Sequence, residues 1–145
     1  IDNWILSPNA SIIQLGIKTM VFYNYLNQSE EIIKLINYQN ETIKKEAIIA
    51  IRDLYLYEAE GDLIRIFDIS GDEIKFEILV TLKIIGKEKT ITFLKNKINT
   101  EINLDLKLKA VDCLNMLQKA ELDNMAFKDP ELEKMILHVR NKYIV

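Results

Sequence analysis

The sequence predicts an all-α fold of stacked helix pairs, in one domain that spans residues 1–145. Three features indicate this: a recurring helical phrase, few helix-breaking residues, and polar residues that precede each copy of the phrase. Only four glycines and two prolines occur among the 145 residues, far fewer than the many turns of an all-β chain would need. Apolar residues make up 49% of the chain, which is enough to build a buried core.

The recurring phrase is nearly constant in spacing. Its three clear copies begin at Ile43, Ile74 and Leu106, which are 31 and 32 residues apart, and a weaker copy begins at Ile12. A fixed period in this range is typical of architectures in which each unit stacks on its neighbours. Within each copy the apolar positions fall at 0, +4, +5, +7, +8 and +11, which is one broad face of an α-helix.

Aligned copies of the phrase form columns of apolar and small residues, which we expect to face the core. The copies supply Ile12, Gly16, Ile17, Thr19, Met20 and Tyr23; Ile43, Ala47, Ile48, Ala50, Ile51 and Leu54; Ile74, Ile78, Leu79, Thr81, Leu82 and Ile85; and Leu106, Ala110, Val111, Cys113, Leu114 and Leu117. The lone cysteine, Cys113, therefore shares its column with Thr19, Ala50 and Thr81, and we interpret it as a small core residue.

A second, shorter helix is expected after each phrase. Ile32 and Ile36 recur 31 residues later as Leu63 and Phe67, in the spacing of a helix face. The expected repeats cover about 7–37, 38–70, 71–102 and 103–128. Because Pro130 suits the first turn of a helix, we expect a final helix over 130–143 that caps the last repeat.

Each copy of the phrase follows a helix-start signal. The signals are Ser7-Pro8, Asn40, Gly71-Asp72 and Asn103. Three Asn-x-Ser/Thr sequons coincide with expected helix starts, and they begin at Asn9, Asn27 and Asn40. Since Asn is a favoured N-cap, we interpret these residues as caps rather than as glycosylation sites.

Two-helix units of about 31 residues, whose first helix reads apolar-x-x-x-small-apolar-x-x-apolar, resemble HEAT repeats and HEAT-like, armadillo-type repeats. The resemblance covers residues 7–127. It implies a right-handed α-α superhelix of about four HEAT-like helix pairs plus the C-terminal capping helix. The Arg and Asp ladder of that family is only hinted at here, by Arg52, Asp53, Asp62 and Arg65.

No catalytic constellation is present in the sequence. Cys113 and His138 are its only cysteine and histidine, and a Cys–His nucleophile pair is less favoured than a core cysteine and an ordinary surface histidine. No Cys/His cluster suits zinc, and no glycine-rich loop suits phosphate. We therefore expect a protein that is not an enzyme and has no cofactor or metal. No apolar run reaches the length of a membrane span.

The clearest departure from the repeat lies in the second helix of the third unit. The positions of Ile64 and Ile66 become Lys95 and Lys97 there, and Lys87 and Lys89 open the same helix. Between residues 75 and 109 there are eight lysines against four acids, while residues 58–73 hold six acids against Arg65. A basic strip of this kind could meet an acidic partner or a phosphate; the alternative is a solvated helix face. The candidate partner-binding residues are Arg65, Lys87, Lys89, Lys95 and Lys97.

Aromatic residues near the ends of the first helices leave two alternatives open. The tyrosines at 23, 25, 55 and 57 could form an exposed contact patch or pack against the loop that leads into the second helix. Trp4, which has no matching column, could cover the N-terminal end of the stack or belong to a larger interface.

The leading hypothesis is a non-catalytic protein–protein interaction or scaffold module, monomeric and cytoplasmic, whose partner is another, acidic protein. Nucleic-acid binding is the second hypothesis, and the net charge of −3 counts against it. The third is a membrane-proximal regulatory domain, motivated by the start at Ile1 rather than Met, with any anchor outside this chain and the domain facing the cytoplasm. The high content of Ile, Lys and Asn suits an AT-rich bacterial genome.

Overall fold

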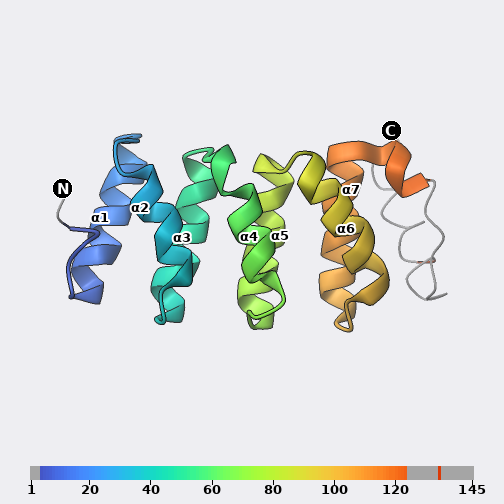
Figure 1. Ribbon diagram of the computed structural model, residues 1–145, viewed down its shortest axis with the longest axis horizontal. Coiled ribbons are helices and arrows are strands. Elements are labelled where there is room, and N and C mark those ends of the chain that lie inside the picture. Colours follow the sequence, from blue (N-terminus) through green and yellow to red (C-terminus); the bar gives the residue numbers. More distant parts are fainter. Residues whose placement is uncertain (1–3, 124–133, 135–145) are drawn as a thin grey trace. The chain divides into compact units, whose positions relative to one another are not determined.

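The computed structural model describes residues 4–123 and residue 134 (Figure 1). Within these residues every regular element is a helix, which confirms the all-α prediction. The capping helix expected over 130–143 and His138 lie outside the described residues.

The chain divides into two compact units between Ile85 and Gly86. The described helices of the first unit are α1 (Ala10–Phe22), α2 (Ser29–Lys34), the 3-10 turn η1 (Leu35–Asn37), α3 (Glu41–Asp53), the 3-10 turn η2 (Tyr57–Ala59), α4 (Glu60–Phe67) and α5 (Asp72–Ile85). Those of the second are α6 (Glu88–Thr100) and α7 (Leu104–Asp123). The backbone of Gln118, at φ −160° and ψ 89°, interrupts α7.

Helices α1, α3 and α5 carry the recurring phrase and form the main stack of the first unit. The principal contacts run from α1 to α3 and from α3 to α5. Helix α2 with η1 packs on α3, and α4 packs on α5. Figure 1 shows α1 and α3 running in the same direction, with α2 returning between them. In the second unit α6 packs against α7.

The expected columns account for most of the core. In α3 and α5 the residues of the phrase are no more than 6% exposed, from Ile43 at 0% to Leu54 at 6%. In α7 the column residues from Leu106 to Leu114 are buried as well, including Cys113. The interpretation of this cysteine as a core residue is therefore confirmed.

The columns were wrong at two positions of the first copy. Ile12 is 39% exposed and Tyr23 is 69% exposed, whereas Ile13 is buried at 1%. The buried face of α1 is Ile13, Gly16, Ile17 and Met20, the ordinary i, i+3, i+4, i+7 stripe. Ile12 lies to one side of this stripe, and Tyr23 is the residue that follows α1, so neither side chain belongs to the buried face.

The helix caps repeat with the phrase. The Oδ1 atom of Asn9 accepts from the backbone N–H of Ser11 at 2.9 Å. Thirty-one residues later, Asn40 Oδ1 accepts from the N–H groups of Thr42 at 3.0 Å and Ile43 at 3.2 Å. The interpretation of both residues as caps is confirmed.

Two further asparagines were expected to cap helices, and only Asn103 does so. Asn103 Oδ1 accepts from Leu106 N–H at 3.2 Å, which caps α7 as expected. The expectation for Asn27 was wrong, since Gln28 occupies the N-cap position of α2. Asn27 instead donates from Nδ2 to the Tyr25 hydroxyl at 3.1 Å.

Gly16 allows the N-terminal segment to cross α1 at close range. A Cβ atom at this position would lie 2.8 Å from Trp4 Cβ and 3.1 Å from Ile5 Cγ2. Ile5 is buried at 3% and Trp4 is half-buried. Trp4 therefore covers part of the first helix, which agrees with one of the two alternatives for it.

Replacing Asn40 by Ala should lower the free energy of unfolding by about 1 kcal/mol, because two N–H groups at the start of α3 lose their acceptor. Asn27→Ala is the matched control, since Asn27 caps no helix, and its effect should stay within about 0.5 kcal/mol. Urea denaturation followed by far-ultraviolet circular dichroism measures both. Equal losses for the two variants would contradict the assignment of Asn40 as a cap.

Replacing Gly16 by Ala should push Trp4 and Ile5 away from α1, although Ala is the better helix former by about 1 kcal/mol. The emission of Trp4, the single tryptophan, should then shift to longer wavelength and be quenched more readily by acrylamide. Gly71→Ala is the control, because a Cβ atom there meets nothing within 4 Å. Unchanged emission in Gly16→Ala would show that the close approach is absent in solution.

Candidate functional site

The candidate lysines of the sequence lie on and before α6, in the second unit. Lys87 is the residue before the helix, and Lys89 in the first turn is exposed. Lys95 and Lys97 are half-buried, as expected for long side chains whose stems lie along an apolar surface. The Nζ atom of Lys97 lies 5.9 Å from the centroid of the Phe93 ring, which is a cation–π distance.

Helical spacing separates these lysines into two groups. Residues four apart share a face of a helix, so Lys89, Phe93 and Lys97 form one row, which we call the Lys-Phe-Lys row. The buried residues Leu94 and Ile98 define the inner face of α6. Lys95 lies on the far side of that inner face from the row, so the four lysines do not form one continuous strip.

Arg65 belongs to the first unit and is engaged within it. Its Nη2 atom donates to Asn37 Oδ1 at 3.1 Å and lies 3.7 Å from Asp62 Oδ1. Asn37 ends the second helix of the preceding pair. Arg65 therefore connects two successive second helices, and its contacts explain its place without an external ligand.

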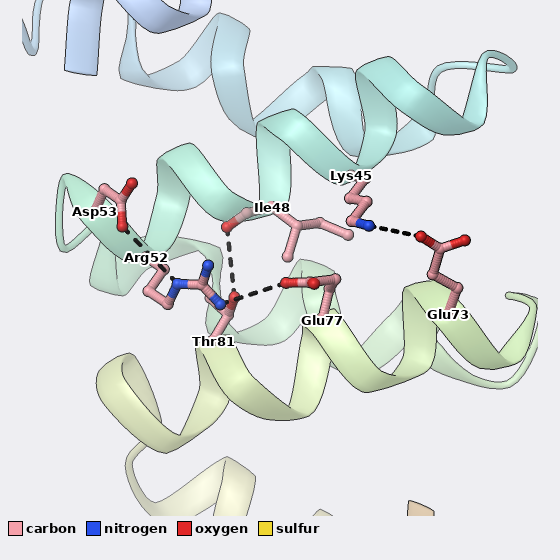
Figure 2. Close-up of polar contacts among 7 residues, drawn as sticks. All are labelled: Lys45, Ile48, Arg52, Asp53, Glu73, Glu77 and Thr81. Atoms are coloured by element: carbon pink, nitrogen blue, oxygen red, sulfur yellow. Dashed lines mark hydrogen bonds and ion pairs between the residues drawn. The ribbon is translucent and has the colours of Figure 1, made fainter. Parts of the chain in front are cut away.

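A row of polar contacts connects α3 with α5 (Figure 2). At one end, Lys45 Nζ lies 2.6 Å from Glu73 Oε1. Toward the other end, the buried hydroxyl of Thr81 donates to the Ile48 carbonyl at 3.4 Å. Next to this bond, Arg52 Nη1 lies 3.4 Å from Glu77 Oε2. These contacts fix the register of one helix on the next.

Arg52 also lies close to a second carboxylate. Its Nε atom lies 3.8 Å from Oδ1 of the neighbouring Asp53. The Glu77 side chain is 17% exposed, whereas that of Asp53 is 46% exposed. One cation is therefore shared between a shielded carboxylate on α5 and an exposed one on α3.

The ion pair of Lys45 and Glu73 shifts the pKa of both side chains. The hydrogen bond from the Lys45 ammonium, with its charge, lowers the pKa of Glu73 below 4.5. The same contact raises the pKa of Lys45 above 10.5. Both groups are at the surface, so salt screens their attraction.

A cavity of about 370 Å³ lies between α1 and α3. Its walls are mostly apolar, with Ile17 and Val21 from α1 and Ile49 and Ala50 from α3. The charged residues at the cavity are Lys18, Glu46 and Asp53. The sequence reasoning missed this site, because the phrase identifies which residues face inward but gives no measure of where two neighbouring helices leave space.

Exposed aromatic rings lie at the end of α1 and just after the ends of α1 and α3. Phe22 is 80% exposed and Tyr23 is 69% exposed, with their rings edge to face at 5.0 Å. Tyr55 and Tyr57, 58% and 48% exposed, stack at 6.3 Å between centroids. Of the two alternatives for the tyrosines, the exposed patch is therefore the one that the structure supports for these three.

Each of these two helix ends turns through a left-handed residue. The residues are Asn24, at φ 51°, and Tyr55, at φ 53°. The next residue in each turn donates back to the helix, from Tyr25 N–H to the Met20 carbonyl at 2.8 Å and from Leu56 N–H to the Ile51 carbonyl at 2.9 Å. This is the Schellman arrangement, which usually has Gly at the left-handed position. A tyrosine there is unfavourable, yet position 55 keeps an exposed ring.

The described residues contain no group of three or more His, Cys, Asp or Glu side chains placed to hold a metal ion. In the same part of the chain, no helix has the length and apolar character to cross a bilayer.

No protein-family model, curated protein or solved structure matches this chain.

The Lys45–Glu73 pair predicts a pH window. Because the folded pKa of Glu73 lies below 4.5, its contribution is present above that value and is lost as the pH falls through the lowered pKa. Because the folded pKa of Lys45 lies above 10.5, its contribution is present below that value and is lost as the pH rises through the raised pKa.

A double-mutant cycle of Lys45→Gln and Glu73→Gln should thus give a favourable coupling at neutral pH that disappears on acidification. It should also shrink in about 1 M salt, where the screening length is near 3 Å. Denaturant midpoints of the four proteins provide the coupling. A coupling that persists after Glu73 is protonated, as followed by NMR, would contradict the ion pair.

Proposed function

We propose that this protein is a non-catalytic protein–protein interaction module. The proposal includes a right-handed HEAT-like superhelix in which the second helices provide a binding surface. The nearest-neighbour packing from α1 to α3 to α5, together with the recurring columns, supports this architecture. A stack of this type presents a large surface for its mass, and each unit depends mainly on its neighbours.

The observation that carries the proposal is the Lys-Phe-Lys row on α6. The row places an aromatic ring, Phe93, between two cations, Lys89 and Lys97. An ordinary solvated helix face would carry polar residues without such a ring. Lys97 already lies over the ring at 5.9 Å, so the row combines positive charge with an apolar contact surface. Aromatic and cationic groups together favour an acidic protein segment with apolar residues, and charge complementarity would speed its encounter.

The double variant Lys89→Glu/Lys97→Glu should weaken binding of a fluorescein-labelled glutamate-rich peptide by about tenfold or more, which corresponds to about 1.4 kcal/mol. Lys95→Glu is the matched control, because it reverses a charge on the same helix but outside the row. Its binding should remain within about twofold of the original protein. Fluorescence anisotropy measures the affinities, and circular dichroism checks that each variant is folded.

A single-stranded oligonucleotide with the same net charge as the peptide distinguishes nucleic-acid binding from protein binding. Under the proposal it binds more weakly than the peptide at physiological salt. If it binds more tightly, with the steep salt dependence of phosphate contacts, the protein-interaction assignment is wrong. If Lys95→Glu loses as much peptide binding as the double variant does, the Lys-Phe-Lys row is not the binding site.

A further inference from the structure

The cavity between α1 and α3 has an apolar interior and an acidic edge. Ile17 and Ala50, at its base, are 2% and 1% exposed. A volume of about 370 Å³ falls within the range of small ligand pockets. It is large enough for a Leu, Met or Phe side chain, and its apolar walls would stabilise such a group by removing it from water.

The carboxylates at the cavity are not fully matched by cations. Lys18 Nζ lies 3.7 Å from Glu46 Oε1, but Glu46 Oε2 is buried without a hydrogen-bond partner in the structure. Asp53 shares Arg52 with Glu77 on α5. Two carboxylates therefore face the cavity with one lysine from α1, so the site has room for an additional cation.

The dipoles of the two helices also favour a cation at this cavity. Helices α1 and α3 run in the same direction and end next to the cavity, at Phe22 and Asp53 (Figure 1). The carboxyl end of a helix carries about half a negative charge. The last turn of α1 has no basic residue. That of α3 contains Arg52, but this one cation is shared by two carboxylates, Asp53 and Glu77, so a net negative charge lies at a helix end that disfavours it. This end of the cavity is therefore electronegative.

The exposed aromatic rings adjoin the same helix ends. Phe22 lines the cavity and contacts Tyr23, and the stacked pair of Tyr55 and Tyr57 follows Asp53 in the chain. Strained backbone that keeps a bulky side chain exposed, as at Tyr55, is characteristic of functional surfaces. Aromatic residues are also enriched among the side chains that dominate binding energy at interfaces.

We propose that this cavity and its aromatic edge bind a peptide segment of a partner protein in which a large apolar residue is followed by lysine or arginine. The apolar side chain enters between α1 and α3. The cation lies beside Asp53 and the carboxyl ends of the two helices, where the face of the Phe22 ring can contact it. This site differs in charge and position along the chain from the Lys-Phe-Lys row, and it does not depend on the function proposed for that row.

A labelled synthetic peptide with a central Leu-Lys-Arg sequence tests the proposal on the full chain. Fluorescence anisotropy should show saturable binding, and two control peptides should bind about tenfold more weakly. One control replaces Lys-Arg by Glu-Glu, and the other replaces Leu by Ser. Equal binding of the acidic control would overturn the charge assignment, and equal binding of the Ser control would overturn insertion into the cavity.

Variants of the protein locate the site. Phe22→Ser and Asp53→Asn should each weaken binding of the basic peptide by about fivefold or more. Both side chains are exposed enough to be changed without loss of folding. Ile69→Ser, at a residue 83% exposed, and Glu30→Gln on α2 are matched controls that should bind as the original protein does. Lys89→Glu/Lys97→Glu should also retain binding, which separates this site from the row on α6.

Two results would overturn the proposal. One is unchanged affinity in both Phe22→Ser and Asp53→Asn. The other is sedimentation evidence that the protein is a stable homodimer dispersed by Phe22→Ser, since a second copy would then occupy this surface in place of a peptide.

Discussion

The first unit depends on the burial of α3 between α1 and α5. Helix α3 contributes apolar residues along its length, and Ala47 and Ala50 are buried at 0% and 1%. These short side chains bring the neighbouring helices close enough for Ile48 and Ile51 to be removed from water. Since burial of each such side chain contributes on the order of 2 kcal/mol, the other features of the unit are arranged around this contact.

Polar groups then select one arrangement among those that apolar burial would allow. The Asn caps fix where α1 and α3 begin, and the Schellman turns fix where they end. Thr81 and Arg52 attach α5 to α3 at defined points. Both candidate binding surfaces follow from the packing of the helices: the cavity lies between α1 and α3, and the Lys-Phe-Lys row lies beside the buried face of α6.

Much of this could be predicted from the sequence, because its signals are local and periodic. The phrase predicted the helices and nearly all of the buried columns, and it predicted the core position of Cys113. It failed at Ile12, because the weaker first copy does not show which of the adjacent residues Ile12 and Ile13 belongs to the buried stripe. It failed at Asn27, because a sequon and a cap have the same residue type. The lysines were found as departures from the repeat, but their division into a row and a separate Lys95 required the helical register.

The cavity could not have been predicted, since its volume depends on how two helices meet and not on either one. Its charged residues gave no sequence signal: Lys18, Glu46 and Asp53 resemble ordinary surface residues until α1 is placed against α3. The clearest local sign was Tyr55, a bulky residue where the turn favours Gly, but the left-handed backbone becomes visible only in the structure.

The one-sided packing of α1 has a consequence for the dynamics of the first unit. Helix α3 is held by neighbours on two sides, whereas α1 exposes Ile12, Leu15 and Phe22 and depends chiefly on α3 and on the short segment of Trp4 and Ile5. In a stack with mainly nearest-neighbour contacts, local opening begins where a helix has fewest partners. We therefore expect the amide protons of α1 to exchange with solvent faster than those of α3. The α1 wall of the cavity would then adapt more readily to a ligand than the α3 wall.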